Sequence, residues 1–93
     1  MIERLKNLAT TFLDYDSFNM FCFYIDNNYI NKARVIIEDV AVTLSNNLIN
    51  NHMFNKGYNN EVTSFQYSNL TEVDNILTEM VITKSITSDV NVN

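Results

Sequence analysis

The sequence predicts an α+β fold, in which three amphipathic helices pack with a short antiparallel sheet in a small single domain, residues 1–93. Apolar residues recur at helical spacing in three segments, and two other short segments have the composition or the alternation of strands. The hydrophobic content of 46% is enough to build a core. A mostly α-helical fold is the alternative, because one of the two strand-like segments also has helical spacing.

The first predicted helix covers residues 2–13, where the apolar side chains fall on one helical face. Residues 18–25 then form an aromatic-rich run in which both the even and the odd positions carry apolar side chains. In a strand these positions point to opposite faces, so the run favours a strand that is buried on both faces. The run also contains apolar residues at helical spacing, so a helix stays open as the alternative: Phe18, Phe21, Cys22 and Ile25.

Residues 28–53 form the strongest predicted element, a helix with a continuous apolar core stripe. At 1.5 Å per residue such a helix is roughly 39 Å long. A compact chain of this size has a diameter of only about 30 Å. Either the helix breaks near residues 45–47 or the molecule is elongated.

The same helix carries a second apolar stripe on the side opposite its core stripe. We expect this stripe to form a homodimer interface, because so short a chain has little material to cover both faces. The alternative is a helix covered on both sides within its own domain. The stripe consists of Val35, Val42, Ile49 and Met53.

The last third of the chain predicts a strand, a helix and a second strand. Residues 63–67 alternate apolar and polar side chains, as in a half-exposed strand. Asn69 followed by Glu72 has capping-box spacing and is expected to begin the third helix. Residues 82–86 are expected to form a short edge strand, and residues 87–93 a polar, frayed tail.

The composition is acidic and rich in amides. Sixteen asparagines accompany only four lysines, and eleven acids outnumber six bases, for a net charge of −5. This balance argues against direct nucleic-acid binding, which needs clustered cations, and favours basic protein partners. The alternative is that the charge only keeps the domain soluble. With one cysteine and no long apolar run, the chain is expected to be a cytoplasmic protein with no membrane association.

Enzyme chemistry, a metal site and a bound cofactor are not expected. His52 is the only histidine and has no evident nucleophile, and Cys22 lies among aromatic residues as a small core side chain. Asp14 and Asp16 are close in sequence but lack the glycine of a calcium loop, so a turn and a helix cap are their expected role. Gly57 stands alone, without a phosphate-binding loop.

The acids on expected exposed faces are the candidate partner-binding residues. A homodimer would carry twice the charge of one chain and could present two matching acidic faces along an elongated body. The candidates are Asp14, Asp16, Glu38, Asp39, Glu72, Asp74 and Glu79.

This profile, acidic, amide-rich, elongated and without catalytic motifs, resembles the small phage-encoded DNA mimics that act against host restriction, of the Arn type. The resemblance covers the character of the whole chain and includes no sequence motif. It implies a host-defence inhibitor in the host cytoplasm that blocks a basic restriction or nucleoid-associated protein by stoichiometric binding, with carboxylates in place of DNA phosphates.

Two other functions are compatible with the sequence. The first is a homo-oligomeric structural or regulatory module that binds a partner through the second apolar stripe, with little dependence on salt. The second is a small-ligand site in the aromatic segment, although aromatic residues at that density more often form a core. That segment contains Phe18, Phe21, Phe23 and Tyr24.

Overall fold

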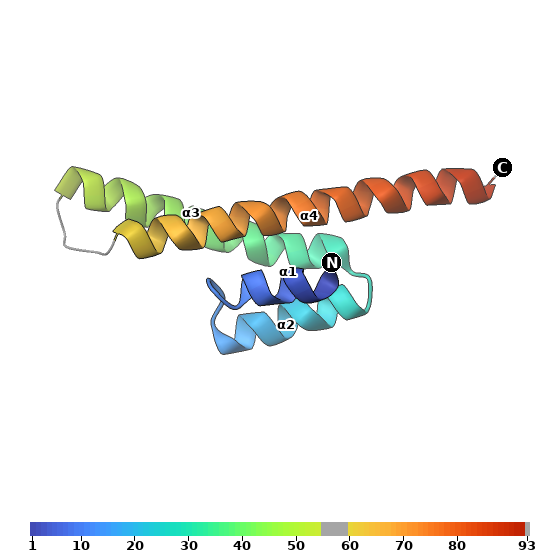
Figure 1. The fold of residues 1–93 in the computed structure, drawn as a ribbon, viewed down its shortest axis with the longest axis horizontal. Coiled ribbons are helices and arrows are strands. Elements are labelled where there is room, and N and C mark those ends of the chain that lie inside the picture. Colours follow the sequence, from blue (N-terminus) through green and yellow to red (C-terminus); the bar gives the residue numbers. More distant parts are fainter. Residues whose placement is uncertain (55–59, 93) are drawn as a thin grey trace.

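The computed structural model describes the backbone of residues 1–54 and 60–92, and the side chains of residues 1–50 and 61–83. This part of the chain contains four α-helices and no β-strand. The long helices α3 and α4 lie side by side and antiparallel, and α1 and α2 lie against one side of this pair (Figure 1). The helices are α1 (Ile2–Ala9), α2 (Tyr15–Asp26), α3 (Ile30–Phe54) and α4 (Asn60–Val92).

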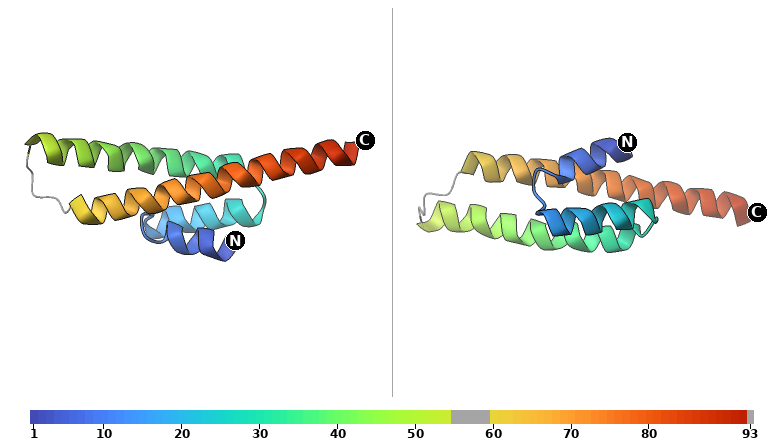
Figure 2. Two further views of the ribbon diagram at one scale, coloured as in Figure 1. Left: turned by 45° about the horizontal axis from the view of Figure 1, so that its top comes forward. Right: turned by 90° about the horizontal axis from the view of Figure 1, so that it is seen from below.

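The molecule is elongated, as one of the two alternatives for the long helix required. The Cα atoms extend over 57 × 23 × 18 Å, with a radius of gyration of 15.4 Å. A compact chain of this length has a radius of gyration of about 12 Å. The shape arises because α3 runs without a break through residues 45–47 and because α4 continues past the start of α3 (Figures 1 and 2).

The predicted α+β fold is wrong, and the alternative, a mostly α-helical fold, is correct. Residues 18–25 lie in α2, where Phe21 and Ile25 are buried and Phe23 is 58% exposed. A buried strand would bury the side chains on both of its faces, whereas a helix packed on one side buries only one stripe of side chains. Asp14 begins the helix, since its carboxylate accepts a hydrogen bond from the Ser17 backbone N–H at 2.8 Å.

The predicted strand at residues 63–67 is also wrong, because these residues belong to α4. Their apparent alternation is part of a longer helical pattern. With neither proline nor glycine between residues 60 and 92, nothing stops the helix. Its buried residues recur every three, four or seven positions, and they are Thr63, Leu70, Val73 and Leu77.

The predicted capping box and edge strand are wrong for the same reason. Asn69 lies inside α4, and its side-chain amide donates a hydrogen bond to Thr11 Oγ1 at 3.0 Å instead of capping a helix. Residues 82–86 and 87–92, expected as an edge strand and a frayed tail, have a helical backbone in α4. The side chains from residue 84 onward, and residue 93, lie outside the described part.

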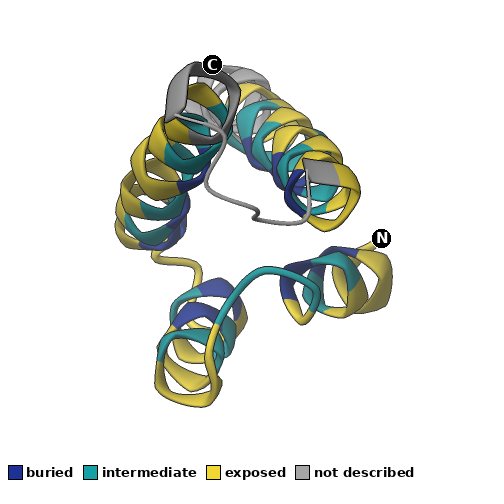
Figure 3. Ribbon diagram, turned by 90° about the vertical axis from the view of Figure 1, so that its left-hand side faces the viewer, coloured by how far each residue is buried: buried dark blue, intermediate teal, exposed yellow. Residues whose placement is uncertain are grey.

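All four helices contribute to one core. Each helix turns its buried stripe toward the other three and its exposed stripe outward, as the end-on view shows (Figure 3). The turn between α2 and α3 depends on Asn28, whose φ of 65° is a left-handed conformation that asparagine tolerates well. The core residues are Leu5 and Ala9 of α1, Phe21 and Ile25 of α2, Ile30, Ala33, Ile37 and Leu44 of α3, and Leu70, Val73 and Leu77 of α4.

Candidate interaction surfaces

A groove between α3 and α4 brings together two of the predicted partner-binding acids. Glu38 of α3 and Asp74 of α4 both line it, and its volume is about 350 Å³. No lining residue comes from α1 or α2. The groove therefore combines carboxylates with apolar and aromatic surface, and its other lining residues include Ile37, Ala41, Tyr67, Leu70 and Thr71.

Arg34 also lines this groove and makes it only partly acidic. Its Nε atom is buried and has no hydrogen-bond partner in the described part of the chain. Arg34 and Glu38 are four residues apart on α3, so they lie on the same face of the helix, one turn apart. With one cation and two carboxylates, the groove carries a net negative charge.

Two other acids are paired with bases in the structure. Glu72 accepts a hydrogen bond from the Arg4 guanidinium and forms an ion pair that joins α4 to α1. Asp26 accepts one from Lys6 Nζ at 2.7 Å. This hydrogen bond raises the pKa of Lys6 above its usual value. Glu72, predicted to contact a partner, is therefore less available than a free surface acid.

Asp14 and Asp16 begin α2 and have different roles. Asp14 is the N-cap, and the hydrogen bonds from Ser17 lower the pKa of its carboxyl. This confirms the cap expected from the sequence. Asp16 is exposed in the first turn, where a negative charge suits the positive end of the helix dipole.

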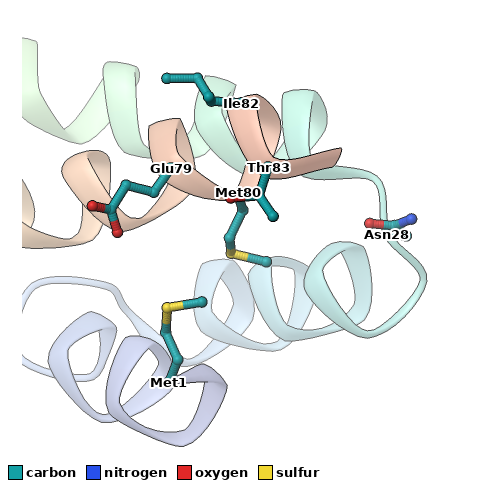
Figure 4. Close-up of a pocket in the computed structure, with 6 residues that line it drawn as sticks. All are labelled: Met1, Asn28, Glu79, Met80, Ile82 and Thr83. Carbon is teal, nitrogen blue, oxygen red and sulfur yellow. The ribbon is translucent and has the colours of Figure 1, made fainter. Parts of the chain in front are cut away.

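The remaining predicted acids are exposed and lie apart from each other. Asp39 is exposed on α3. Glu79 is exposed on α4 and lies at the edge of a cavity of about 580 Å³ between α1, the α2–α3 turn and α4. In this cavity Met1 and Met80 point toward one another, whereas the Glu79 carboxylate points away from them (Figure 4). The cavity is therefore mainly apolar.

The second apolar stripe of α3 is exposed along its described length. Val35, Val42 and Ile49 are 55%, 61% and 54% exposed. The core residues of α3 lie on its opposite side, so the other three helices leave the stripe uncovered. The side chain of Met53, expected in the same stripe, lies outside the described residues.

The aromatic segment of α2 contributes to the core and to an exposed ring cluster. Phe21 is buried, Phe18 and Tyr24 are partly buried against the core, and Phe23 is exposed. Lys32 Nζ lies 5.1 Å from the ring centroid of Tyr29 and 5.8 Å from that of Tyr24. None of the aromatic residues of α2 lines the cavities described above, so a ligand site in this segment gains no support.

Reactive and metal-binding groups are sparse in the described part of the chain. Burial raises the pKa of the Cys22 thiol and keeps it protonated at neutral pH. No group of three or more potential metal ligands occurs among the described residues, and the side chain of His52 lies outside them. No described helix is long and apolar enough to cross a membrane.

The groove itself could not be predicted from the sequence, because its two walls are distant in the chain. The sequence predicts Glu38 and Asp74 only as exposed acids, and it predicts no contact role for Arg34 or Tyr67. A usable signal existed in the core stripes of α3 and α4, which indicate two long helices. The register between two antiparallel helices, however, depends on tertiary packing.

Comparisons with known proteins identify no relative of this chain. No family model matches it, and no curated protein or solved structure is significantly similar to it.

Proposed function

We propose that this chain is a non-enzymatic inhibitor that binds a basic, DNA-binding protein through an acidic helical surface. Within this proposal the protein mimics DNA, is phage-encoded and blocks a host restriction or nucleoid-associated protein in the host cytoplasm. The observation that carries the proposal is the groove in which Glu38 and Asp74, from two different helices, lie beside apolar surface.

The groove suits the side chains that a DNA-binding surface presents. An arginine or lysine could lay its aliphatic stem on Ile37 and Leu70 and bring its charge to the two carboxylates. Tyr67 adds an aromatic wall that can attract the same cation. The elongated body, 57 Å along its longest axis, has the extended shape that a protein in a DNA-binding cleft requires.

The charge distribution around the groove differs from that of an ordinary solvent-exposed surface. Arg4 and Lys6 of α1 are paired with acids on α4 and α2, respectively, so these cations do not oppose a basic partner at the groove. Complementary charge accelerates encounter and makes binding weaken as salt increases. Arg34 reduces this attraction, because its positive charge offsets part of the negative charge of the groove.

The test is capture from a bacterial lysate on the immobilised chain, followed by elution with a salt gradient and, separately, with duplex DNA. We expect basic DNA-binding proteins to be captured and to be displaced by DNA. The double variant E38Q/D74N should lose them at lower salt. The matched control E3Q/D16N removes the same charge from exposed positions of α1 and α2, away from the groove, and leaves the Lys6–Asp26 pair intact. Equal behaviour of the two variants would show that only net charge matters.

A second function is favoured by the exposed stripe of α3. In this alternative the chain is an interaction module that binds a partner helix through Val35, Val42 and Ile49, and its acidity only provides solubility. Capture that withstands both high salt and DNA but is lost in V42N would support the second function. It would also contradict the DNA-mimic proposal.

A further inference from the structure

The stripe formed by Val35, Val42 and Ile49 has a symmetry that a partner of the same sequence would match. Seven residues separate each neighbouring pair, which is two turns of a helix. Val42 is therefore the midpoint of these three residues. If α3 packs against α3 of a second copy in the opposite direction, Val42 meets Val42 and Val35 meets Ile49, so each of these three apolar side chains has an apolar partner.

The charges of α3 favour the same direction. The charged side chains of α3 all lie between Lys32 and Asp39, and residues 40–50 contain no charged side chain. In an antiparallel pair, the charged half of each helix lies against the uncharged half of the other. Glu38 and Asp39 of one copy then face the neutral Ser45 and Asn46 of the second. Polar side chains flank the stripe without an unfavourable charge contact.

A parallel pair is less favourable for two reasons. It would place Glu38 and Asp39 of one copy beside the same two acids of the other, with four carboxylates at one level of the interface. It would also place Lys32 of one copy beside the basic residues of α3 in the other copy, Lys32 and Arg34. The antiparallel pair avoids both repulsions and retains the apolar contacts.

We infer that two copies of this chain associate through α3 in an antiparallel arrangement, with a two-fold axis at Val42. This inference rests on the second proposed function, the use of the stripe as an interaction surface. Three half-exposed aliphatic side chains supply less than the roughly 800 Å² per partner of a standard stable interface. The dimer is therefore weak, and its population depends on protein concentration.

The first part of the test is sedimentation equilibrium of the full chain over a range of concentrations. The average mass should rise from monomer toward dimer in the wild type. In V42N the dissociation constant should increase by at least about tenfold, because the contact between the two Val42 side chains is lost. The control M20N removes a similarly exposed apolar side chain from α2 and should behave as wild type.

Disulfide cross-linking tests the direction, with Cys22 replaced by Ser to leave one cysteine per chain. V42C should cross-link to itself, and V35C should cross-link to I49C when the two variants are mixed. V35C alone should not cross-link to itself. Self-linking of V35C would indicate a parallel pair and overturn the inference.

Failure of the inference and failure of the function it rests on are distinguishable. A wild type that stays monomeric at every concentration overturns the dimer. If V42N nevertheless loses the salt-resistant proteins captured from lysate, the stripe binds another protein and the second function stands. If V42N changes neither mass nor capture, both fail.

Discussion

Arg4 of α1 and Glu72 of α4 form an ion pair that ties the first helix to the last. The turn that follows α1 is also joined to α4, by hydrogen bonds from Gln66 Nε2 to the Thr11 carbonyl and from Asn69 to the Thr11 hydroxyl. α1 is therefore held on α4 by polar contacts as well as by its buried residues Leu5 and Ala9. A predicted contact acid thus has a role within the fold.

Replacing Glu72 by Gln should cost little stability, because the pair is exposed. The side chains of Arg4 and Glu72 are 64% and 40% exposed, and exposed pairs contribute at most about 1 kcal/mol. Urea denaturation of E72Q should therefore show a small loss that decreases further in high salt. A loss of several kcal/mol would mean that the pair determines where α1 packs.

The double variant E72Q/E79Q should weaken capture of basic proteins while the fold is retained. Glu79 is an exposed acid of α4 at the edge of the cavity beside α1, and Glu72 lies seven residues before it. Because Glu72 is already neutralised by Arg4, we expect E79Q alone to produce most of the contact loss. The measurement is the salt concentration that elutes the captured proteins, with circular dichroism to verify helicity. Unchanged elution would exclude the face of α4 that carries Glu72 and Glu79 as a contact surface.

Replacing Arg34 by Gln should strengthen the binding of basic proteins. The substitution removes the one cation that lines the groove with Glu38 and Asp74, so the repulsion of a partner's arginine or lysine decreases. K32Q is the matched control, since Lys32 is a cation of α3 that lies against Tyr24 and Tyr29 and outside the groove. Elution of R34Q at higher salt than K32Q is expected. Equal shifts would mean that the groove is not the contact site.

The helices that the sequence predicts well are those with a long one-sided stripe. The spacing of Ile37 and Leu44 predicts α3 because both residues face one core across many turns. Residues 18–25 and 63–67 are helical and do not form the predicted strands, for a different reason. In windows this short, aromatic and β-branched side chains fit a strand as well as a helix, and only the neighbouring helices determine which stripe is buried.

The candidate surfaces are likewise predictable from the sequence only where they depend on local contacts. Exposure of Val35 and Val42 follows from the helical period alone, so it could be predicted before the structure was known. The meeting of Glu38 with Asp74 depends on the register between α3 and α4, which no local pattern encodes. The cap at Asp14 was predictable, since it involves contacts only three residues apart.

Phe21 and Phe23 should respond very differently to truncation. Phe21 is fully buried, so F21A leaves a cavity and should destabilise the fold by about 3–5 kcal/mol. Phe23 is 58% exposed, and F23A should cost no more than about 1 kcal/mol, mainly through its edge-to-face contact with Tyr24. Chemical denaturation of both variants provides the measurement. Similar losses would contradict the helical assignment of α2.

The cap at Asp14 should make stability depend on pH in the acidic range. The hydrogen bonds from Ser17 lower the pKa of this carboxyl in the folded state below its usual value of 3.8. A carboxyl with a lowered folded pKa contributes stability that is fully present above its unfolded pKa. That contribution is lost as the pH falls through the folded pKa.

Thermal unfolding of wild type and D14N across the acidic range isolates this contribution from those of the other acids. Asparagine is also a good N-cap, so D14N should retain most of the stability at neutral pH and lose less than wild type on acidification. D14A lacks the cap and should melt at a lower temperature than both at neutral pH. Parallel pH curves for wild type and D14N would show that the charge of Asp14 does not stabilise α2.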